Sequence, residues 1–191
     1  MYDEKLKEEV RKACEVLKKG GIILYPTDTI WGIGCDATNE EAVKRVYELK
    51  HRVDSKAMLI LLDDVGKLAS YVEVPDVAYD LLEVSDKPMT IIYPNAKNLA
   101  TNLIAQDRTV GVRITSEAFT KALLRLFRRP IVSTSANISG EPSPRCFAEI
   151  SDAVKNAVDY VVDYRQEEKT NPAPSSIIKL GVGGEIQIIR K

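Results

Sequence analysis

Short apolar runs alternate along this chain with longer segments in which apolar residues recur every three or four positions. A short run is typical of a strand buried on both faces, and the longer period is typical of an amphipathic helix. Helices are expected at 2–19, 38–50, 116–127 and 147–157, with two shorter ones between 63 and 85; strands are expected at 22–25, 57–62, 89–93, 109–114, 131–134 and 160–164, and a hairpin at 175–189. Thr38 and Ser116 are the expected N-caps of the second and third long helices. The alternation predicts an α/β fold in which helices cover a sheet.

The stretch 22–37 joins an apolar strand to a polar loop. Pro26 ends the strand because it has no N–H to donate. The Thr-Asp-Thr of 27–29 then offers oxygen-bearing side chains, and Gly32 and Gly34 allow close approach to the backbone. We interpret this loop as the edge of a ligand site, although the same residues also fit an ordinary turn.

The length and the net charge of the chain limit the classes of protein to which it can belong. A chain of 191 residues with 45% hydrophobic residues can bury the core of one domain, so 1–191 is expected to be a single unit. The 27 basic and 28 acidic side chains nearly cancel, which removes a global attraction to nucleic acid or membrane. The N-terminus is rich in Lys and Glu, and no run of about 18 apolar residues occurs, so the cytoplasm is expected.

Metal and redox chemistry find little support in the sequence. Cys14, Cys35 and Cys146 are far apart and match no zinc or redox spacing, and His51 is the single histidine. We expect the three thiols to be reduced and partly buried. The signatures GxSxG, GxxxxGK[ST] and GxGxxG are also absent from the sequence, so the usual hydrolase, P-loop and Rossmann readings are not supported.

Cations and short polar donors gather in segments that lie next to expected strands. Lys50, Arg52 and Lys56 bring three positive charges within seven residues, and Arg113 stands near the end of its strand. The segment 135–143, SANISGEPS, adds hydroxyl, amide and backbone N–H donors. Because open α/β sheets bind ligands at strand ends, these segments and the Thr-Asp-Thr loop are predicted to meet in one crevice for an anion-rich ligand.

Each of these features also has a simpler explanation. Cations at a helix end fit a solvated surface favoured by the helix dipole, and 135–140 fits a capping turn. Asp28 fits an Asx turn, and Trp31 fits packing against its own loop. His51 is expected to be an exposed side chain, because nothing near it in sequence pairs with it.

Four motifs taken together are more specific than any one. They are PTDTIWGIGCDA at 26–37, KHR at 50–52 with Lys56, VSTSANISG at 132–140 and PSSII at 174–178. In this order and spacing the chain resembles, over nearly its whole length, the short form of the threonylcarbamoyl-AMP synthase family, also called YrdC-like or TsaC-like proteins. The resemblance implies a single YrdC-like domain at 1–191, with a twisted mixed β-sheet flanked by helices and a concave, positively charged ligand crevice.

The resemblance also implies a nucleotidyltransferase, an L-threonylcarbamoyladenylate synthase. Such an enzyme forms threonylcarbamoyl-AMP and pyrophosphate from L-threonine, bicarbonate and ATP, and a tRNA-modifying transferase complex places the threonylcarbamoyl group on adenosine next to the anticodon. A carbamate is already an anionic nucleophile, so positioning and charge stabilisation are the main tasks of the protein. Mg²⁺ is expected to be held by the ATP phosphates, without protein ligands.

The site residues follow from matching the motifs residue by residue. The implied catalytic, phosphate-binding tetrad is Lys50, Arg52, Ser135 and Asn137. The implied ATP contacts are Arg52, Lys56, Thr109, Ser135, Asn137 and Ser143, and the implied threonine contacts are Thr29, Arg113, Ser133 and Ser175. The chain departs from the usual family pattern at Val53, Ala57, Leu61, Trp31 and the SDKP segment of 85–88.

A second hypothesis assigns the chain to a different class of protein. A noncatalytic RNA-binding module could use a basic concave surface formed by the cations of 50–56 and those of the later helix, which are Lys121, Arg125, Arg128 and Arg129. Such a module would bind tRNA with steep salt dependence and would not bind a nucleotide.

Overall fold

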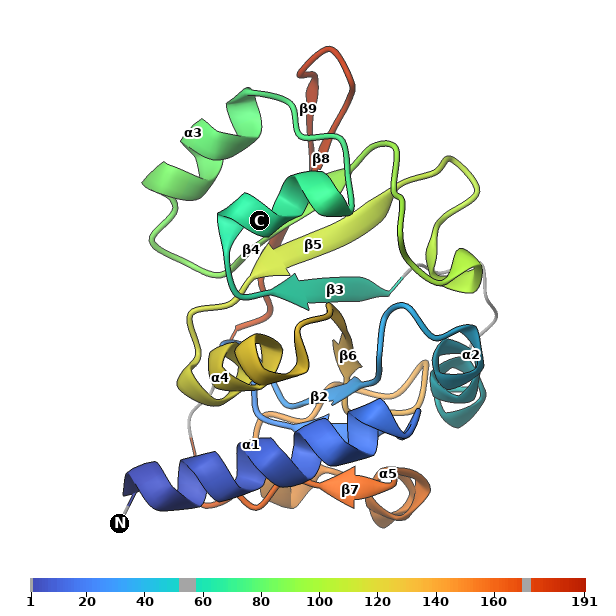
Figure 1. Cartoon of the computed structure of the whole chain (residues 1–191), viewed down its shortest axis with the longest axis vertical. Coiled ribbons are helices and arrows are strands. Elements are labelled where there is room, and N and C mark those ends of the chain that lie inside the picture. The colour runs from blue at the N-terminus through green and yellow to red at the C-terminus, as the bar shows by residue number, and fades with distance from the viewer. Residues whose placement is uncertain (1, 52–57, 170–172) are drawn as a thin grey trace.

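The computed structural model describes residues 2–51, 58–169 and 173–191. These residues form one nine-stranded sheet in the order β7-β1-β2-β6-β3-β5-β4-β8-β9 (Figure 1). The strands are β1 (Ile23–Tyr25), β2 (Gly32–Gly34), β3 (Leu59–Leu62), β4 (Met89–Tyr93), β5 (Val110–Ile114), β6 (Ile131–Ser135), β7 (Tyr160–Val161), β8 (Ser176–Leu180) and β9 (Ile186–Arg190). The α-helices are α1 (Tyr2–Lys18), α2 (Glu40–Leu49), α3 (Val77–Val84), α4 (Ala118–Phe127) and α5 (Asp152–Ala157), and the 3₁₀ helices are η1 (Val65–Ser70), η2 (Thr101–Leu103) and η3 (Phe147–Glu149).

The sheet is mixed. The pairs β1/β7, β3/β5 and β4/β8 are parallel, and the other neighbouring pairs are antiparallel. In the middle of the sheet, Leu59 of β3 pairs with Gly111 of β5 and with Ser133 of β6. The α/β class with a twisted mixed sheet flanked by helices is therefore confirmed.

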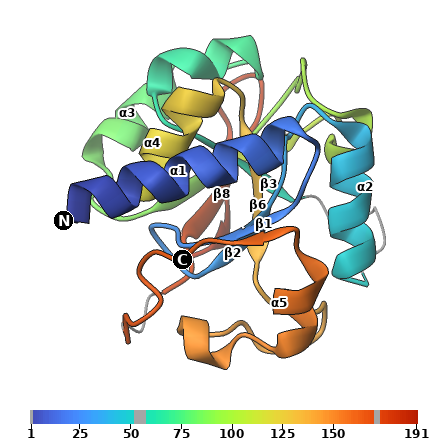
Figure 2. The ribbon, with the colours of Figure 1, turned by 60° about the horizontal axis from the view of Figure 1, so that its bottom comes forward.

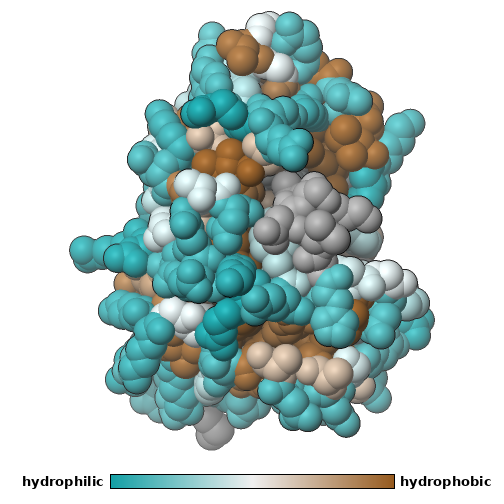
Figure 3. Space-filling model, turned by 90° about the vertical axis from the view of Figure 1, so that its right-hand side faces the viewer, coloured by the Kyte–Doolittle hydropathy of each residue, from teal (hydrophilic) through white to brown (hydrophobic). Residues whose placement is uncertain are grey.

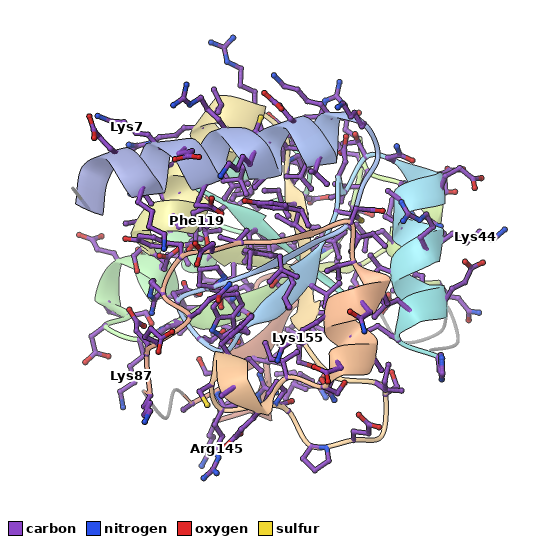
Figure 4. The ribbon with its side chains drawn as sticks, turned by 90° about the horizontal axis from the view of Figure 1, so that it is seen from below. Lys7, Lys44, Lys87, Phe119, Arg145 and Lys155 are labelled. Atoms are coloured by element: carbon purple, nitrogen blue, oxygen red, sulfur yellow. The ribbon has the colours of Figure 1, made fainter. Side chains whose placement is uncertain are left out.

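Helices cover both faces of the sheet (Figure 2). On one face, α1 and α4 pack against each other and bury strand residues such as Ile23 and Leu61. Figure 4 shows Phe119 of α4 enclosed beneath α1, whereas Lys7 and Lys44 project outward. On the other face, α2, η1, α3 and α5 bury the alternate strand residues, and Ile60 belongs to this second cluster. The apolar periods of the sequence thus predict the positions of the three longest helices, α1, α2 and α4.

The loop expected after β1 contains a strand that was not predicted. Gly32 and Gly34 lie in β2, which pairs with β1 and with β6. A Cβ on Gly34 would lie 2.7 Å from the ring of Tyr25. The interpretation of these glycines as loop residues was wrong, because their role is to let neighbouring strand residues pack over a bare backbone.

Two helix caps and one helix also differ from the prediction. Asn39, not Thr38, caps α2 by accepting from the Ala42 N–H at 3.1 Å. Glu117, not Ser116, caps α4. The predicted helix 147–157 is split into η3 and α5. For the two caps, a neighbouring side chain accepts the N–H groups of the first turn, and sequence spacing does not distinguish adjacent residues.

Cys14 and Cys35 are buried free thiols and Cys146 is half-buried. Burial raises the pKa of the Cys35 thiol well above its usual range. Among the described residues, no helix combines the length and the apolar character needed to cross a membrane.

Candidate functional site

A cavity of about 200 Å³ lies over the middle of the sheet. Its lining brings together residues from five separate parts of the chain, which are 29–32, 58–59, Arg113, 133–143 and 174–190. Of the predicted site residues, it includes Thr29, Arg113, Ser133, Ser135, Ser143 and Ser175. Hydrophilic side chains cover much of the molecular face shown in Figure 3.

The cavity occupies a face of the sheet and not a common edge of strand ends. Leu59 and Ser133 are cross-strand partners and both line it, and so are Gly32 and Ser135. Because partners in register point to the same face, these residues share the face that α1 and α4 cover elsewhere. Of the segments predicted to meet in one crevice, Thr29, Arg113, Ser135 and Ser143 do lie together in this cavity. The strand β6 contributes its last residues to it, and β3 its first.

Arg113 forms a buried ion pair with Asp28. Its Nε lies 3.0 Å from Asp28 Oδ1, and the two side chains are 4% and 7% exposed. Both atoms lack a hydrogen-bond partner among the described residues, so the contact is electrostatic without hydrogen-bond alignment. Of the two side chains, Arg113 lines the cavity, and its other nitrogens remain as donors for a ligand. The interpretation of Asp28 as a local turn residue missed this partner, which is 85 positions away in the sequence.

Thr29 presents an acceptor to the cavity. The Thr27 hydroxyl donates to the carbonyl of Ile30 at 2.7 Å and lies 3.1 Å from the Thr29 hydroxyl. A hydroxyl has one hydrogen, so Thr29 must be the donor in the contact between the two threonines. The oxygen of Thr29 therefore retains lone pairs for a donor on a ligand.

Ser175 and Arg190 form another wall of the cavity. The Ser175 hydroxyl bonds that of Thr90 at 2.8 Å, and Arg190 donates to the Ser175 carbonyl at 2.7 and 2.9 Å. Burial, and then the positive charge of Arg113, lower the pKa of Arg190, so two guanidinium groups act on the same region. Arg190 was not predicted as a site residue. The feature of the sequence that pointed to it is its position directly after the predicted hairpin, which ends at residue 189.

Lys50 fixes the loop that follows β6. Its Nζ lies 2.5 Å from the Ser135 carbonyl, 3.4 Å from the Ser135 hydroxyl and 3.3 Å from Asn137 Oδ1. The Lys50 carbonyl accepts from Ser139 N–H at 2.9 Å. The structure thus brings three members of the predicted tetrad together, and only Ser135 among them lines the cavity. The predicted contacts Arg52 and Lys56 lie outside the described residues.

Thr109 is not among the residues that line the cavity. It precedes β5, and its hydroxyl donates to Asp107 Oδ1 at 2.6 Å. Lys179 also donates to the Asp107 carboxylate, and the hydrogen bonds from Lys179 and Thr109 lower the pKa of Asp107. Thr109 lies two residues before Gly111, the partner of Leu59, and is therefore close to the cavity along the sheet but beyond its lining.

Trp31 lines the cavity and also packs within the protein. Its ring lies 4.9 Å from that of Phe147, between centroids. The ammonium of Lys155 lies 4.8 Å from the centroid of Phe147. The expectation that Trp31 packs against its own loop did not include this partner, which lies in η3. His51 is exposed, as expected.

The described residues lack a cluster of side chains that could bind a metal ion. Within the described ranges, no group of three or more His, Cys, Asp or Glu side chains could hold an ion. The carboxylate of Asp28 is engaged by Arg113. What the lining offers is positive charge and hydroxyl groups, a combination suited to carboxylates and phosphates.

Comparison with known proteins gives consistent results. Residues 15–191 match the family model for Sua5, YciO and YrdC proteins, which is described as "Telomere recombination". The threonylcarbamoyl-AMP synthase of Pseudoalteromonas translucida is 34% identical over 181 residues, which cover 93% of this chain and 95% of that protein.

Two solved structures share the fold. The P. abyssi Sua5 structure complexed with L-threonine has a TM-score of 0.82 and 28% identity, covering 90% of this chain and 50% of that one. HypF in a phosphate- and nucleotide-bound form has a TM-score of 0.81 and 25% identity, covering 95% of this chain and 28% of that one. This chain therefore spans half of the Sua5 chain and a smaller part of HypF.

Proposed function

The chain belongs to the family of Sua5, YciO and YrdC proteins, and we propose from this premise that it is a threonylcarbamoyl-AMP synthase. This enzyme is a nucleotidyltransferase that converts L-threonine, bicarbonate and ATP into threonylcarbamoyl-AMP and pyrophosphate. The threonine amine and bicarbonate condense to a carbamate with loss of water. A carbamate oxygen then attacks the α-phosphorus, and the bond to the β-phosphate breaks as pyrophosphate leaves.

The observation that carries the proposal is the buried Arg113, which is paired with Asp28 and lines a cavity rich in hydroxyl groups. Threonine carries a carboxylate, an amine and a hydroxyl, and these groups match the chemistry of the lining. We assign the carboxylate to Arg113, which can form a bidentate contact. Thr29 supplies an acceptor, and Ser133 and Ser175 complete the assigned contacts.

The nucleotide is assigned to the other side of the cavity. Ser135 and Ser143 line it, and Lys50 and Asn137 hold the loop between them. We expect the phosphates to lie along this loop and the nucleoside to extend toward Thr109. Arg52 and Lys56 complete the proposed contacts on the grounds of motif position alone. HypF, of which 28% matches this chain, has been solved in a phosphate- and nucleotide-bound form, and a relative that binds such ligands is consistent with the proposed anion site.

The remaining parts of the reaction are also proposals. Mg²⁺ enters as the complex with ATP, because phosphate oxygens are its preferred ligands and the described lining offers no carboxylate cluster. The product goes to a transferase complex that modifies adenosine beside the tRNA anticodon, and we place the reaction in the cytoplasm with its tRNA substrate.

The noncatalytic RNA-binding reading is not favoured. Arg129 of its basic cluster contacts Asp36 at 2.8 Å, and Arg125 lies 3.8 Å from Asp63, so acidic partners offset part of the charge. The later part of the predicted basic surface, Lys121, Arg125, Arg128 and Arg129, belongs to α4 and the turn after it, and none of these four residues lines the cavity. Of the cations of 50–56, Arg52 and Lys56 lie outside the described residues.

The test is the release of pyrophosphate by the purified protein. We expect release with ATP, Mg²⁺ and bicarbonate to require L-threonine. Pyrophosphate release that does not depend on threonine, or tRNA binding with no nucleotide binding, would reject the synthase assignment.

A further inference from the structure

The segment of Pro26 to Thr29 is held in place by residues that do not line the cavity. Arg165 donates from Nη1 to the carbonyl of Thr27 at 3.3 Å, and the same nitrogen lies 3.2 Å from Glu117 Oε1. The Thr120 hydroxyl lies 3.0 Å from the carbonyl of Pro26 and 2.8 Å from Glu117 Oε2, so these two acceptors share its one hydrogen. Two consecutive carbonyls of the loop are therefore bound by one polar network.

Glu117 ties this network to a rigid element. Its side chain is 7% exposed, and it accepts from the N–H groups of Phe119 at 3.1 Å and Thr120 at 2.7 Å. These bonds cap α4, whose first turn favours a negative charge. The helix thus fixes the carboxylate that Arg165 contacts.

Arg165 also forms an ion pair with Glu168. Its Nε and Nη2 donate to the two oxygens of Glu168 at 2.8 and 2.7 Å. The preceding Tyr164 stacks on Phe119 with 6.0 Å between ring centroids. The backbone of Arg165 has a φ of 61°, a conformation that costs free energy in a residue other than glycine. Contacts to three different groups stabilise it.

We propose that Arg165 is a positioning residue for threonine binding, which acts through the carbonyl of Thr27. Asp28 and Thr29 are the next two residues of the chain. Asp28 contacts Arg113, and Thr29 lines the cavity. A shift of the Thr27 backbone therefore moves both groups. This role rests on the proposed function, because it assumes that threonine binds beside Thr29.

The test compares the full-length protein with Arg165→Ala, Arg165→Lys and the control Arg45→Ala. Arg45 is matched because it also bonds a carboxylate, with its Nη2 at 2.9 and 3.0 Å from the two oxygens of Asp159, and a backbone carbonyl, that of Gly20 at 3.2 Å. It lies on α2. Pyrophosphate release is measured against threonine and against ATP, and unfolding midpoints confirm that each variant is folded.

For Arg165→Ala we expect kcat/KM for threonine to fall about 10- to 100-fold, mainly through KM, because displacing a positioned group by about 1 Å has effects of this order. The KM for ATP should stay within about twofold, and Arg45→Ala should stay within about twofold for both substrates, since exposed ion pairs contribute little. Arg165→Lys should recover part of the loss, because an ammonium can still bond one carbonyl.

An unchanged KM for threonine in folded Arg165→Ala would overturn the role. An equal rise in the KM values for threonine and ATP would also overturn it, as would the same rise in the threonine KM of Arg45→Ala. If Arg165→Ala does not fold, an unchanged threonine KM in Arg165→Lys would overturn it. These results leave the proposed function intact if the unmodified protein is active, whereas an unmodified protein without threonine-dependent turnover would overturn both.

Discussion

Arg113 is buried beside a carboxylate, and that burial decides what it can bind. A guanidinium has five N–H donors, so contact with Asp28 through Nε is compatible with a bidentate contact to a ligand carboxylate through its other nitrogens. Removing one member of a buried pair leaves an uncompensated charge, whereas removing both is often close to neutral for stability. Stability and binding can therefore be separated by mutation.

We predict that Arg113→Met alone lowers the free energy of unfolding by about 3–5 kcal/mol, because Asp28 is left as a buried charge. The double variant Asp28→Asn/Arg113→Met should regain most of that stability without regaining threonine binding. Denaturant unfolding measures the first effect, and calorimetry with threonine and a nonhydrolysable ATP analogue measures the second. A double variant that still binds threonine would show that the pair is purely structural.

Lys50 offers a second prediction at this scale. Lys50→Met removes charged hydrogen bonds to the loop after β6, each of which contributes roughly 1.5–3 kcal/mol. We expect a loss of stability of at least this order and a weaker affinity for the ATP analogue. Lys44→Met is the control, because Lys44 lies on α2, the helix that Lys50 directly follows, and points outward (Figure 4). Equal ATP affinities for the two variants would contradict the role of the loop in nucleotide binding.

At the scale of elements, the sequence predicts best where packing repeats a simple period. The long helices and most strands follow from apolar spacing, because that spacing sets which side chains can be buried together. The strand β2 could not be found this way, since two of its three residues are glycines, which have no side chain to form a pattern. The caps Asn39 and Glu117 were each missed by one residue, because adjacent polar residues compete for the same N–H groups.

The packing of β2 makes its glycines testable. A Cβ on Gly34 would overlap the Val132 carbonyl and lie 2.7 Å from the Tyr25 ring, and both residues are buried. We expect Gly34→Ala to lower the free energy of unfolding by roughly 1–3 kcal/mol, as overpacking does. Gly66→Ala is the control, because its nearest atom is a side-chain oxygen of Asp64 at 3.0 Å, which can move. Equal unfolding midpoints for the two variants would contradict the described packing of β2 against β6.

At the scale of the whole molecule, the site depends on a strand order that local patterns do not contain. The mixed sheet places β6 beside both β2 and β3, so Ser133 and Ser135 meet residues from the first third of the chain. The C-terminal hairpin adds Ser175 and Arg190 to the same cavity. Six of the predicted site residues line this cavity, whereas Arg190 and the partner role of Asp28 depended on long-range geometry.

The central claim is that this one cavity joins threonine, bicarbonate and ATP. The most direct measurement supplies ¹⁴C-bicarbonate with L-threonine, ATP and Mg²⁺, and follows both labelled product and pyrophosphate. We predict a labelled threonylcarbamoyl-AMP that forms in equal amount with pyrophosphate and is not formed when threonine is omitted. Pyrophosphate without labelled product, or product that forms without threonine, would contradict it.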